Sequence, residues 1–214
     1  ISDNVSLHIL ADGMGGYAFG AKAAKLVAEH IYYTISELKV NITKEIVQKA
    51  IYDANESLYR YALEHRIELG STLGGALLTE EKSLLFWVGD VRLYYYRKNE
   101  LIFKSVDHTL LNEMKDINAL PRSWNKSEIK HFVTKSLTGD QKYSKPDIYE
   151  IEQPLSSDTI ILCSDGAVNS LKAIDIQYLN SINIETSNTI MKKFKNSEDN
   201  ASILKVNKFI KEQV

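Results

Sequence analysis

Cysteine is nearly absent from this sequence, since Cys163 is the only one among 214 residues. A disulfide within the chain and a metal site built from several thiolates are therefore both excluded. Cys163 lies in the run TIILCSDG, and its apolar neighbours favour a buried core thiol over a nucleophile. A reducing, cytoplasmic setting is the default expectation for such a chain.

A strong excess of one charge and long apolar runs are also missing. Lys and Arg number 26 against 28 Asp and Glu, and the resulting net charge of −2 gives no electrostatic argument for nucleic acid or an anionic membrane as a partner. The longest apolar runs, such as SLLFWVG and TIILC, are far shorter than the roughly 20 residues that span a bilayer. We therefore expect neither a nucleic-acid nor a membrane partner. The 44% of hydrophobic and 25% of charged residues are typical of a globular domain.

The apolar pattern predicts strands and helices in separate runs along the chain. Strands are expected at 5–11, 71–79, 83–89, 92–98, 100–105, 147–152, 158–163 and 202–207. Helices are expected at about 18–38, from a cap at Asn41 or Thr43 to 65, within 109–117 and 125–137, and as a hairpin over 171–195. The four strands between 71 and 105 are separated by short turns, which indicates an antiparallel meander. Segregated runs of this kind predict an α+β fold, and we interpret 1–214 as a single domain.

Two apolar strands stop on the same dipeptide, Asp-Gly. LHILADG ends at Asp12-Gly13 and IILCSDG ends at Asp165-Gly166, while a third acid, Asp199, precedes the last strand. One such pair is an ordinary turn, but two after buried strands would bring two carboxylates together. Their repulsion would raise their pKa values, and Mg²⁺ or Mn²⁺, which prefer oxygen ligands, would remove it.

A glycine-rich phosphate cradle explains ADGMGG less well. Its spacing matches neither GxGxxG nor the GxxxxGK motif that ends in Ser or Thr. The acid that leads the turn would also repel a phosphate unless a cation lay between them.

Eight pieces of the sequence resemble the metal-dependent protein phosphatase family of the protein phosphatase 2C type, in its bacterial form. They keep the order of the family and span nearly the whole chain: ADGMGG (11–16), AA (23–24), GSTLGGALL (70–78), VGDVRLYYYR (88–97), DHTLLNEM (107–114), LTGD (137–140), CSDGAVNSL (163–171) and EDNAS (198–202). The resemblance implies two antiparallel sheets packed face to face with helix pairs outside, an α-β-β-α sandwich. It also implies hydrolysis of phosphoserine and phosphothreonine by a water that two divalent cations, Mn²⁺ or Mg²⁺, bridge between them. A phosphoprotein is then the substrate and a cognate Ser/Thr kinase a candidate partner.

The resemblance also assigns roles to individual residues. Asp12 should bridge the two cations and Gly13 should offer its backbone carbonyl, while Asp165 and Asp199 should bind the cation on the other side. The supporting residues of the same motifs are Gly15, Gly16, Gly166 and Asn200. Asp12, Asp165 and Asp199 are thus the candidate catalytic residues, acting through the water.

Three departures from the family pattern bear on function. Many bacterial relatives hold a third cation with two aspartates, and the corresponding positions here are Asp90 and Asn169. Because an asparagine replaces the second aspartate, we expect a weaker third site. The alternative, that Asp90 is only a turn residue, stays equally open. Val91 stands where Ser is commonest, which we interpret as a packing variation, and Arg92 beside it as a structural ion-pair partner. Met14 replaces a histidine that is proposed as general acid in some eukaryotic relatives, so no acid is assigned.

A further departure concerns the start of the chain. Family members carry, shortly before the DGMGG strand, a segment with an Arg that holds the phosphate and an acidic pair that contacts metal. Only 1–4 precede the strand here, so the phosphate-binding residues are unknown, and we expect this N-terminal strand segment upstream of the given chain. A catalytically impaired pseudophosphatase that binds phosphoproteins or regulates a partner is the alternative function. An output domain of a larger signalling protein is a more remote one.

Other residues receive structural interpretations. His108 is expected to anchor a loop by hydrogen bonds, and the isolated His8, His30 and His131 to have surface or core roles. The tyrosines at 94–96 are expected to alternate between core and surface. Residues 108–146 are the irregular part of the pattern, and whether they form a flap that selects substrates is left open.

Overall fold

The computed structural model describes residues 5–14, 17–37, 42–121, 124–140, 142, 144–171, 179–181, 184–195, 197 and 199–207. Its strands are β1 (Ser6–Met14), β2 (Gly70–Leu78), β3 (Lys82–Val88), β4 (Arg92–Arg97), β5 (Glu100–Lys104), β6 (Asp147–Glu152), β7 (Asp158–Cys163) and β8 (Ile203–Asn207). Its helices are α1 (Tyr17–Ser36), α2 (Lys44–His65), α3 (Leu110–Asp116), α4 (Lys126–Ile129), α5 (Asp165–Ser170) and α7 (Ile184–Phe194), with a 3₁₀ turn η2 (Leu179–Ser181). Within these ranges no helix is both long and apolar enough to cross a membrane.

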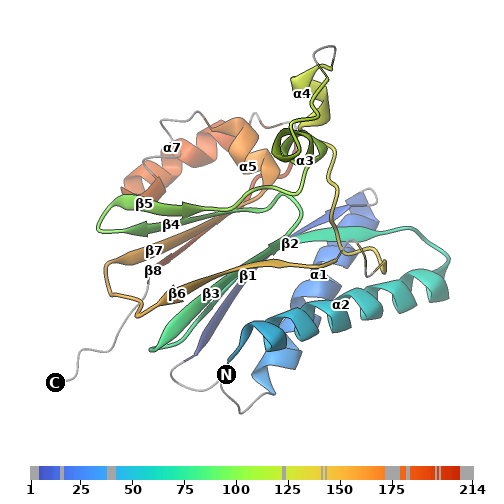
Figure 1. The fold of residues 1–214 in the computed structure, drawn as a ribbon, viewed down its shortest axis with the longest axis horizontal. Coiled ribbons are helices and arrows are strands. Elements are labelled where there is room, and N and C mark those ends of the chain that lie inside the picture. The colour runs from blue at the N-terminus through green and yellow to red at the C-terminus, as the bar shows by residue number, and fades with distance from the viewer. Residues whose placement is uncertain are drawn as a thin grey trace.

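Two antiparallel sheets of four strands each lie face to face (Figure 1). The first sheet has the strand order β1-β2-β3-β6, and the second has the order β5-β4-β7-β8. Helices α1 and α2 cover the outer face of the first sheet, while α5 and α7 lie over the outer face of the second. The predicted α+β fold, an α-β-β-α sandwich, is confirmed.

Helix α2 shows how the sequence sets these layers. Thr43 is its N-cap, and the hydroxyl oxygen of Thr43 accepts a hydrogen bond from the backbone N–H of Ile46. Its buried residues recur at helical spacing and face the first sheet: Val47, Ala50, Ile51, Ala54, Asn55 and Leu58. Helix α1 buries Ala23, Val27, Ile31 and Ile35, which recur at the same spacing.

Side chains of the strands alternate between two cores. In β3, Leu84 and Phe86 pack toward α1 and α2, while Leu85 and Trp87 pack toward the second sheet. Because helices cover the outer faces, each strand in the middle of a sheet is buried on both sides. The prediction that Tyr94–Tyr96 alternate between core and surface is therefore wrong. All three are buried, with Tyr95 between the sheets and the other two under α5 and α7.

The predicted meander is also wrong. Strands β2 and β3 belong to the first sheet and β4 and β5 to the second, so the turn at Gly89-Asp90 carries the chain from one sheet to the other. Gly89 has a φ of 99°, which only glycine adopts without strain. Val91 then enters the core between the sheets, where its side chain fills the space above Gly74. The interpretation of Val91 as a packing variation is confirmed.

The remaining differences lie in the shorter helices. Helix α4 has only four residues of the longer one predicted over 125–137, and α5 follows β7 where only a turn was predicted. Of the helical hairpin predicted over 171–195, η2 and α7 are seen, while 172–178 lie outside the described residues. Helices α3 and α4 project from one end of the sandwich (Figure 1).

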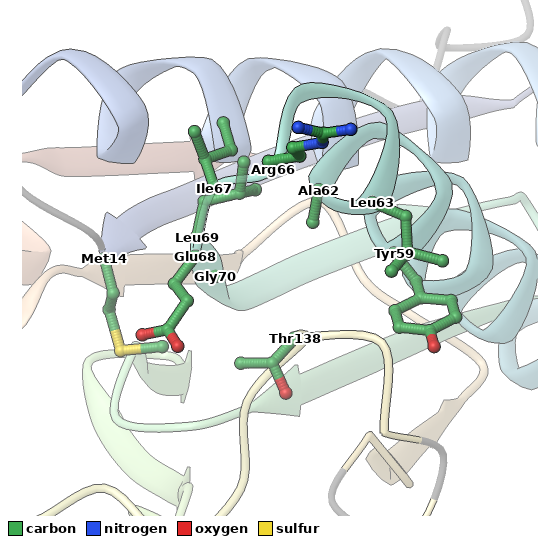
Figure 2. Close-up of a pocket in the computed structure, with 10 residues that line it drawn as sticks. All are labelled: Met14, Tyr59, Ala62, Leu63, Arg66, Ile67, Glu68, Leu69, Gly70 and Thr138. Carbon is green, nitrogen blue, oxygen red and sulfur yellow. The ribbon is translucent and has the colours of Figure 1, made fainter.

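A large cavity lies where α2 ends and β2 begins. Its volume is about 600 Å³, and Met14 at the end of β1, Leu63 on α2 and Thr138 are among the residues that line it. In the view of Figure 2, Met14 and Tyr59 lie at opposite ends of this cavity. We refer to it below as the α2 cavity.

Candidate active site

Acidic residues gather at the end of the sandwich from which α3 and α4 project. Asp12 lies near the end of β1, Asp90 occupies the turn between β3 and β4, and Asp165 follows β7 directly. Asp199 lies just before β8 and is exposed. Two strands from one sheet and two from the other thus bring these four acids to the same region of the molecule.

The carboxylates of these acids interact electrostatically. Burial, followed by the negative charges of Asp165 and Asp199, raises the pKa of Asp12 to about 6. Burial, followed by the charge of Asp165, raises the pKa of Asp90 to about 7. The pKa of Asp165 is raised as well, by burial first and by Asp199 among its neighbours, although the hydrogen bond from Gly166 opposes this. Repulsion between the carboxylates thus adds to the effect of burial in raising these pKa values.

The backbone around Asp12 is held by β2. Asp12 pairs with Thr72, and the hydroxyl of Ser71 donates a hydrogen bond of 3.0 Å to the carbonyl oxygen of Asp12. Gly13 packs against Gly20 of α1 so closely that a Cβ on Gly13 would overlap the Gly20 carbonyl oxygen. The missing side chain of Gly13 therefore lets α1 approach the end of β1.

Ser164 performs a similar task for Asp165. Its hydroxyl donates to the carbonyl oxygen of Asn200 at 3.2 Å and accepts from the backbone N–H of Ser202 at 3.0 Å. As the N-cap of α5 it also accepts a bond from Ala167. A Cβ on Gly166 would overlap the carbonyl oxygen of Asn200. These contacts fix the segment that carries Asp199 against the start of α5.

His108 holds the turn that carries Asp90. Its ring Nδ1 accepts a hydrogen bond of 3.0 Å from the backbone N–H of Gly89, and its Nε2 lies 3.2 Å from a carboxylate oxygen of Asp147. The His108 backbone N–H in turn donates to the Gly89 carbonyl oxygen at 2.9 Å. The interpretation of His108 as a loop anchor is confirmed.

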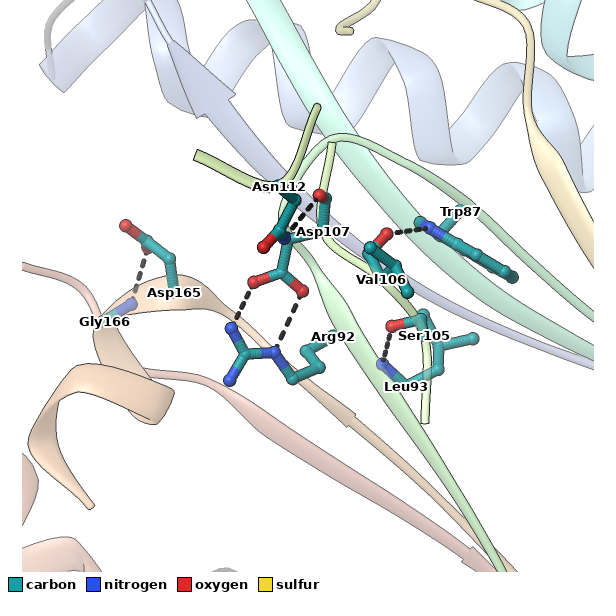
Figure 3. Close-up of polar contacts among 9 residues, drawn as sticks. All are labelled: Trp87, Arg92, Leu93, Ser105, Val106, Asp107, Asn112, Asp165 and Gly166. Carbon is teal, nitrogen blue, oxygen red and sulfur yellow. Dashed lines mark hydrogen bonds and ion pairs between the residues drawn. The ribbon is translucent and has the colours of Figure 1, made fainter. Parts of the chain in front are cut away.

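Arg92 and Asp107 form an ion pair beside the acids (Figure 3). Arg92 Nε donates to Asp107 Oδ1 at 2.9 Å, and a terminal guanidinium nitrogen donates to Oδ2. Asn112 of α3 donates to the Asp107 carbonyl oxygen at 2.9 Å. Arg92 is thus the structural ion-pair partner that the sequence predicted, and the pair ties α3 to β4.

A second cavity, of about 230 Å³, opens between the acids and the projecting helices. Asp90, Asp165 and Asn169 are among the residues that line it, and besides Arg92 the lining has three more basic side chains: Lys115, Lys130 and His131. The positive charge of His131 opposes the rise in the pKa of Asp165. We refer to this second cavity below as the acidic cavity.

Sequence reasoning missed the role of these basic side chains. Lys115 and Lys130 received no role, and His131 was interpreted only as a surface or core residue. They lie in the irregular stretch 108–146, where no periodic pattern or motif indicates which side chains face the acids.

The predicted ligands are not all arranged as ligands of one ion. Within the described ranges, no group of three or more His, Cys, Asp or Glu side chains is placed to hold a metal ion. The carboxylates instead accept local bonds, as Asp199 does from the backbone N–H of Asn200 at 2.7 Å. The ligand roles of Asp12, Gly13, Asp165 and Asp199 stay predictions, and Gly15 and Gly16 lie outside the described residues.

The chemistry of the donor set nevertheless suits hard divalent cations. Carboxylate and carbonyl oxygens are the ligands that Mg²⁺ and Mn²⁺ prefer, and cations would offset the repulsion that raises the pKa values of these acids. Cys163 offers no competing chemistry, because it is buried and burial raises the pKa of its thiol to about 12.

Comparison with known proteins gives a consistent result. The family model described as protein phosphatase 2C matches residues 1–199. The serine/threonine phosphatase stp of Listeria welshimeri is 25% identical over 182 residues, which cover 82% of this chain and 71% of that protein.

Solved structures share the fold. The serine/threonine phosphatase Stp1 from Staphylococcus aureus superposes with a TM-score of 0.80 at 24% identity, covering 97% of this chain and 85% of that one. The catalytic domain of the protein phosphatase PstP, in a complex with two manganese ions, superposes with a TM-score of 0.77 at 23% identity and covers 97% of this chain and 92% of that one.

Proposed function

The chain belongs to the protein phosphatase 2C family, and we propose that it is a metal-dependent phosphatase that hydrolyses phosphoserine and phosphothreonine in proteins. The observation that carries this proposal is the electrostatic interaction between Asp12, near the end of β1, and Asp165, which follows β7 in the other sheet. Their charges interact strongly enough to help raise the pKa of Asp12 to about 6. The matched relatives are named as phosphatases, which does not favour the pseudophosphatase alternative.

We propose that Asp12 is shared by two divalent cations, Mn²⁺ or Mg²⁺. The Gly13 carbonyl would complete one site, and Asp165 and Asp199 would contribute to the other. When bound, such cations activate a water for attack on phosphorus and neutralise the charge on the phosphoryl oxygens. The protein's own contribution is to hold its acids at fixed positions, through Ser71 at Asp12 and Ser164 at Asp165.

We further propose that the basic side chains of the acidic cavity bind the phosphoryl group. Lys115, Lys130 and His131 line the same cavity as Asp165, so they can face a phosphate placed near the acids. Charge-assisted hydrogen bonds from lysine would orient it. A part for 108–146 in substrate selection is consistent with this arrangement.

A weaker third cation site is proposed at Asp90 and Asn169. Both line the acidic cavity, and Asp90 interacts electrostatically with Asp165. Because the amide of Asn169 is neutral, an ion there would be held less firmly than between two carboxylates. A cognate Ser/Thr kinase as partner and a cytoplasmic location are also proposals, based on the family and on the scarcity of cysteine.

The function is tested by phosphate release from phosphoserine and phosphothreonine peptides with Mn²⁺, using protein from the complete natural reading frame. Asp12→Asn should reduce the rate by more than about 100-fold, because even residues that only support metal ligands contribute about 10–100-fold. Asp53→Asn, the same change on the outer side of α2, is the matched control and should keep full activity. A wild-type rate no higher than that of Asp12→Asn would end this interpretation.

A further inference from the structure

The α2 cavity begins beside the candidate catalytic strand. Met14 is the last residue of β1 and lines the cavity, and its partner in the sheet, Gly70, lines it too. Asp12 lies two residues back along the same strand, opposite Thr72. Two residues of a strand correspond to about 7 Å, so the cavity is adjacent to the position where a phosphoryl group must bind.

The walls of the α2 cavity are mainly apolar. The apolar residues that line it come from β1, α2 and the segment before β2: Met14, Tyr59, Ala62, Leu63, Ile67 and Leu69. Leu63 is 60% exposed and Tyr59 is 43% exposed, although both are large apolar side chains. Exposed apolar side chains gathered around a hollow are typical of a binding surface. The volume of about 600 Å³ falls in the range of known ligand sites, about 300–1,000 Å³.

The part of the α2 cavity wall around Thr138 belongs to the end of the irregular stretch 108–146, and hydrogen bonds hold it in place. Leu137 exchanges two backbone hydrogen bonds of 2.9 Å with Ser71 of β2. The N–H of Gly139 donates a bond of 2.7 Å to the side chain of Asn55 on α2. Thr138, between these two anchors, faces the cavity (Figure 2). The cavity is therefore built on elements that are fixed to one another, as a binding site requires.

We propose that the α2 cavity binds an apolar side chain of the phosphoprotein substrate, two to four residues from the phosphorylated Ser or Thr. The inference rests on the proposed function, because that function places the phosphorylated residue at Asp12. An extended peptide advances about 3.3 Å per residue, so its second residue from the phosphate reaches the cavity. Most of the lining is apolar, and its two charged side chains, Arg66 and Glu68, have opposite signs (Figure 2), so the cavity suits an apolar side chain better than the phosphate.

Matched phosphopeptides test the proposal. Each pair carries the same phosphothreonine and differs only in having Leu or Asn at one of the positions two to four residues before or after it. For the wild type, kcat/KM should be about 10-fold higher with Leu at the preferred position, since burial of one such side chain is worth about 1.5 kcal/mol or more. p-Nitrophenyl phosphate, which has no flanking residues, reports on the catalytic site alone.

The variant Leu63→Asn should lose the preference for Leu and keep the turnover of p-nitrophenyl phosphate. Leu63 is largely exposed, so we expect the melting temperature to stay close to that of the wild type. Leu101→Asn is the matched control, because Leu101 is 50% exposed on β5 in the other sheet and should leave the preference intact.

Three outcomes would overturn the inference in distinguishable ways. Wild-type protein that hydrolyses p-nitrophenyl phosphate but treats both peptides of every pair alike would refute the inference and leave the proposed function standing. Wild-type protein that hydrolyses no phosphate ester would refute the proposed function and the inference with it. A change of oligomeric state in Leu63→Asn with unchanged peptide preference would identify the α2 cavity as an interface between copies of the chain.

Discussion

His108 connects the Asp90 turn to three other parts of the molecule. Besides its bonds to Gly89 and Asp147, its ring stacks on Trp87 at a centroid distance of 6.1 Å. Its carbonyl oxygen accepts a bond of 2.9 Å from the backbone N–H of Thr134. One buried residue thus joins the sheet-to-sheet turn and the start of β6 through its ring, and the irregular stretch through its backbone carbonyl.

We expect His108→Ala to lower the free energy of unfolding by about 2–3 kcal/mol. The substitution leaves the buried N–H of Gly89 without an acceptor and creates a cavity beside Trp87. His108→Asn should recover part of the loss, because its side-chain oxygen can still accept the bond from Gly89. Urea unfolding of the three proteins measures this, and equal stability of the Ala and Asn variants would show that the bond to Gly89 contributes nothing.

Asp90 makes the stability of the metal-free protein depend on pH. Its pKa is about 7 in the folded state, well above its ordinary value of 3.8, so the folded protein binds more protons than the unfolded chain between these pH values. The contribution of Asp90 to stability therefore falls as the pH rises from about 4 to about 7.

Asp90→Asn should remove this pH dependence. At pH 4.5 we expect the variant and the wild type to unfold alike in the presence of a chelator. At pH 8 the variant should be more stable by about 2 kcal/mol, since one pKa unit corresponds to about 1.4 kcal/mol and water screens part of the effect. Chemical unfolding at both pH values measures the difference, and a difference that does not grow with pH would contradict the electrostatic account.

A sequence motif identifies a functional residue only where the residue type and its position relative to a strand form a recognisable pattern. Asp12, Asp165 and Asp199 follow or precede apolar strands, so their position at a sheet end could be predicted. Ser164 received no role, since nothing in the sequence tells a serine that caps a helix from one in a turn. The basic side chains of the acidic cavity also escaped prediction, because only the folded irregular stretch brings them to the acids.

At the scale of elements, the end of β1 and helix α1 depend on a contact between two glycines. The backbones of Gly13 and Gly20 approach too closely for a side chain on either. At Gly13 the space that a side chain would need is taken by the backbone of α1.

We expect Gly13→Ala to destabilise the fold by about 3 kcal/mol or more, because the added methyl group forces β1 and α1 apart. Ala21→Ser adds one atom on the exposed side of α1, where it meets no neighbour, and should change the free energy of unfolding by less than about 0.5 kcal/mol. Thermal or urea unfolding measures both. Equal stability of Gly13→Ala and wild type would show that the contact tolerates a side chain.

Strand positions were predictable, whereas strand partners were not. The run from 71 to 105 looks like a meander because its turns are short, yet the chain changes sheets at Gly89. Pairing depends on contacts far apart in the sequence, such as β3 with β6 and β4 with β7. Apolar alternation along one strand carries no information about these partners.

At the scale of the whole molecule, the two sheets share one core and position the site at its end. Residues from both inner faces pack together, among them Leu10, Trp87, Leu93, Tyr95 and Leu162. The sandwich brings Asp12 from one sheet toward Asp165 from the other, although they lie 153 positions apart in the chain. The fold class and the approach of Asp12 and Asp165 could be predicted from the sequence pattern and the family resemblance. That the described carboxylates are not all arranged as ligands of one ion could not.

Anomalous diffraction from crystals soaked in Mn²⁺ tests the central claim most directly. The account predicts two ions about 3.5–4 Å apart, both bound to the Asp12 carboxylate, with Asp165 and Asp199 turned toward one of them. In crystals of Asp12→Asn both signals should be lost or greatly weakened. Crystals of the wild type that show no manganese at Asp12, or manganese bound only elsewhere, would contradict it.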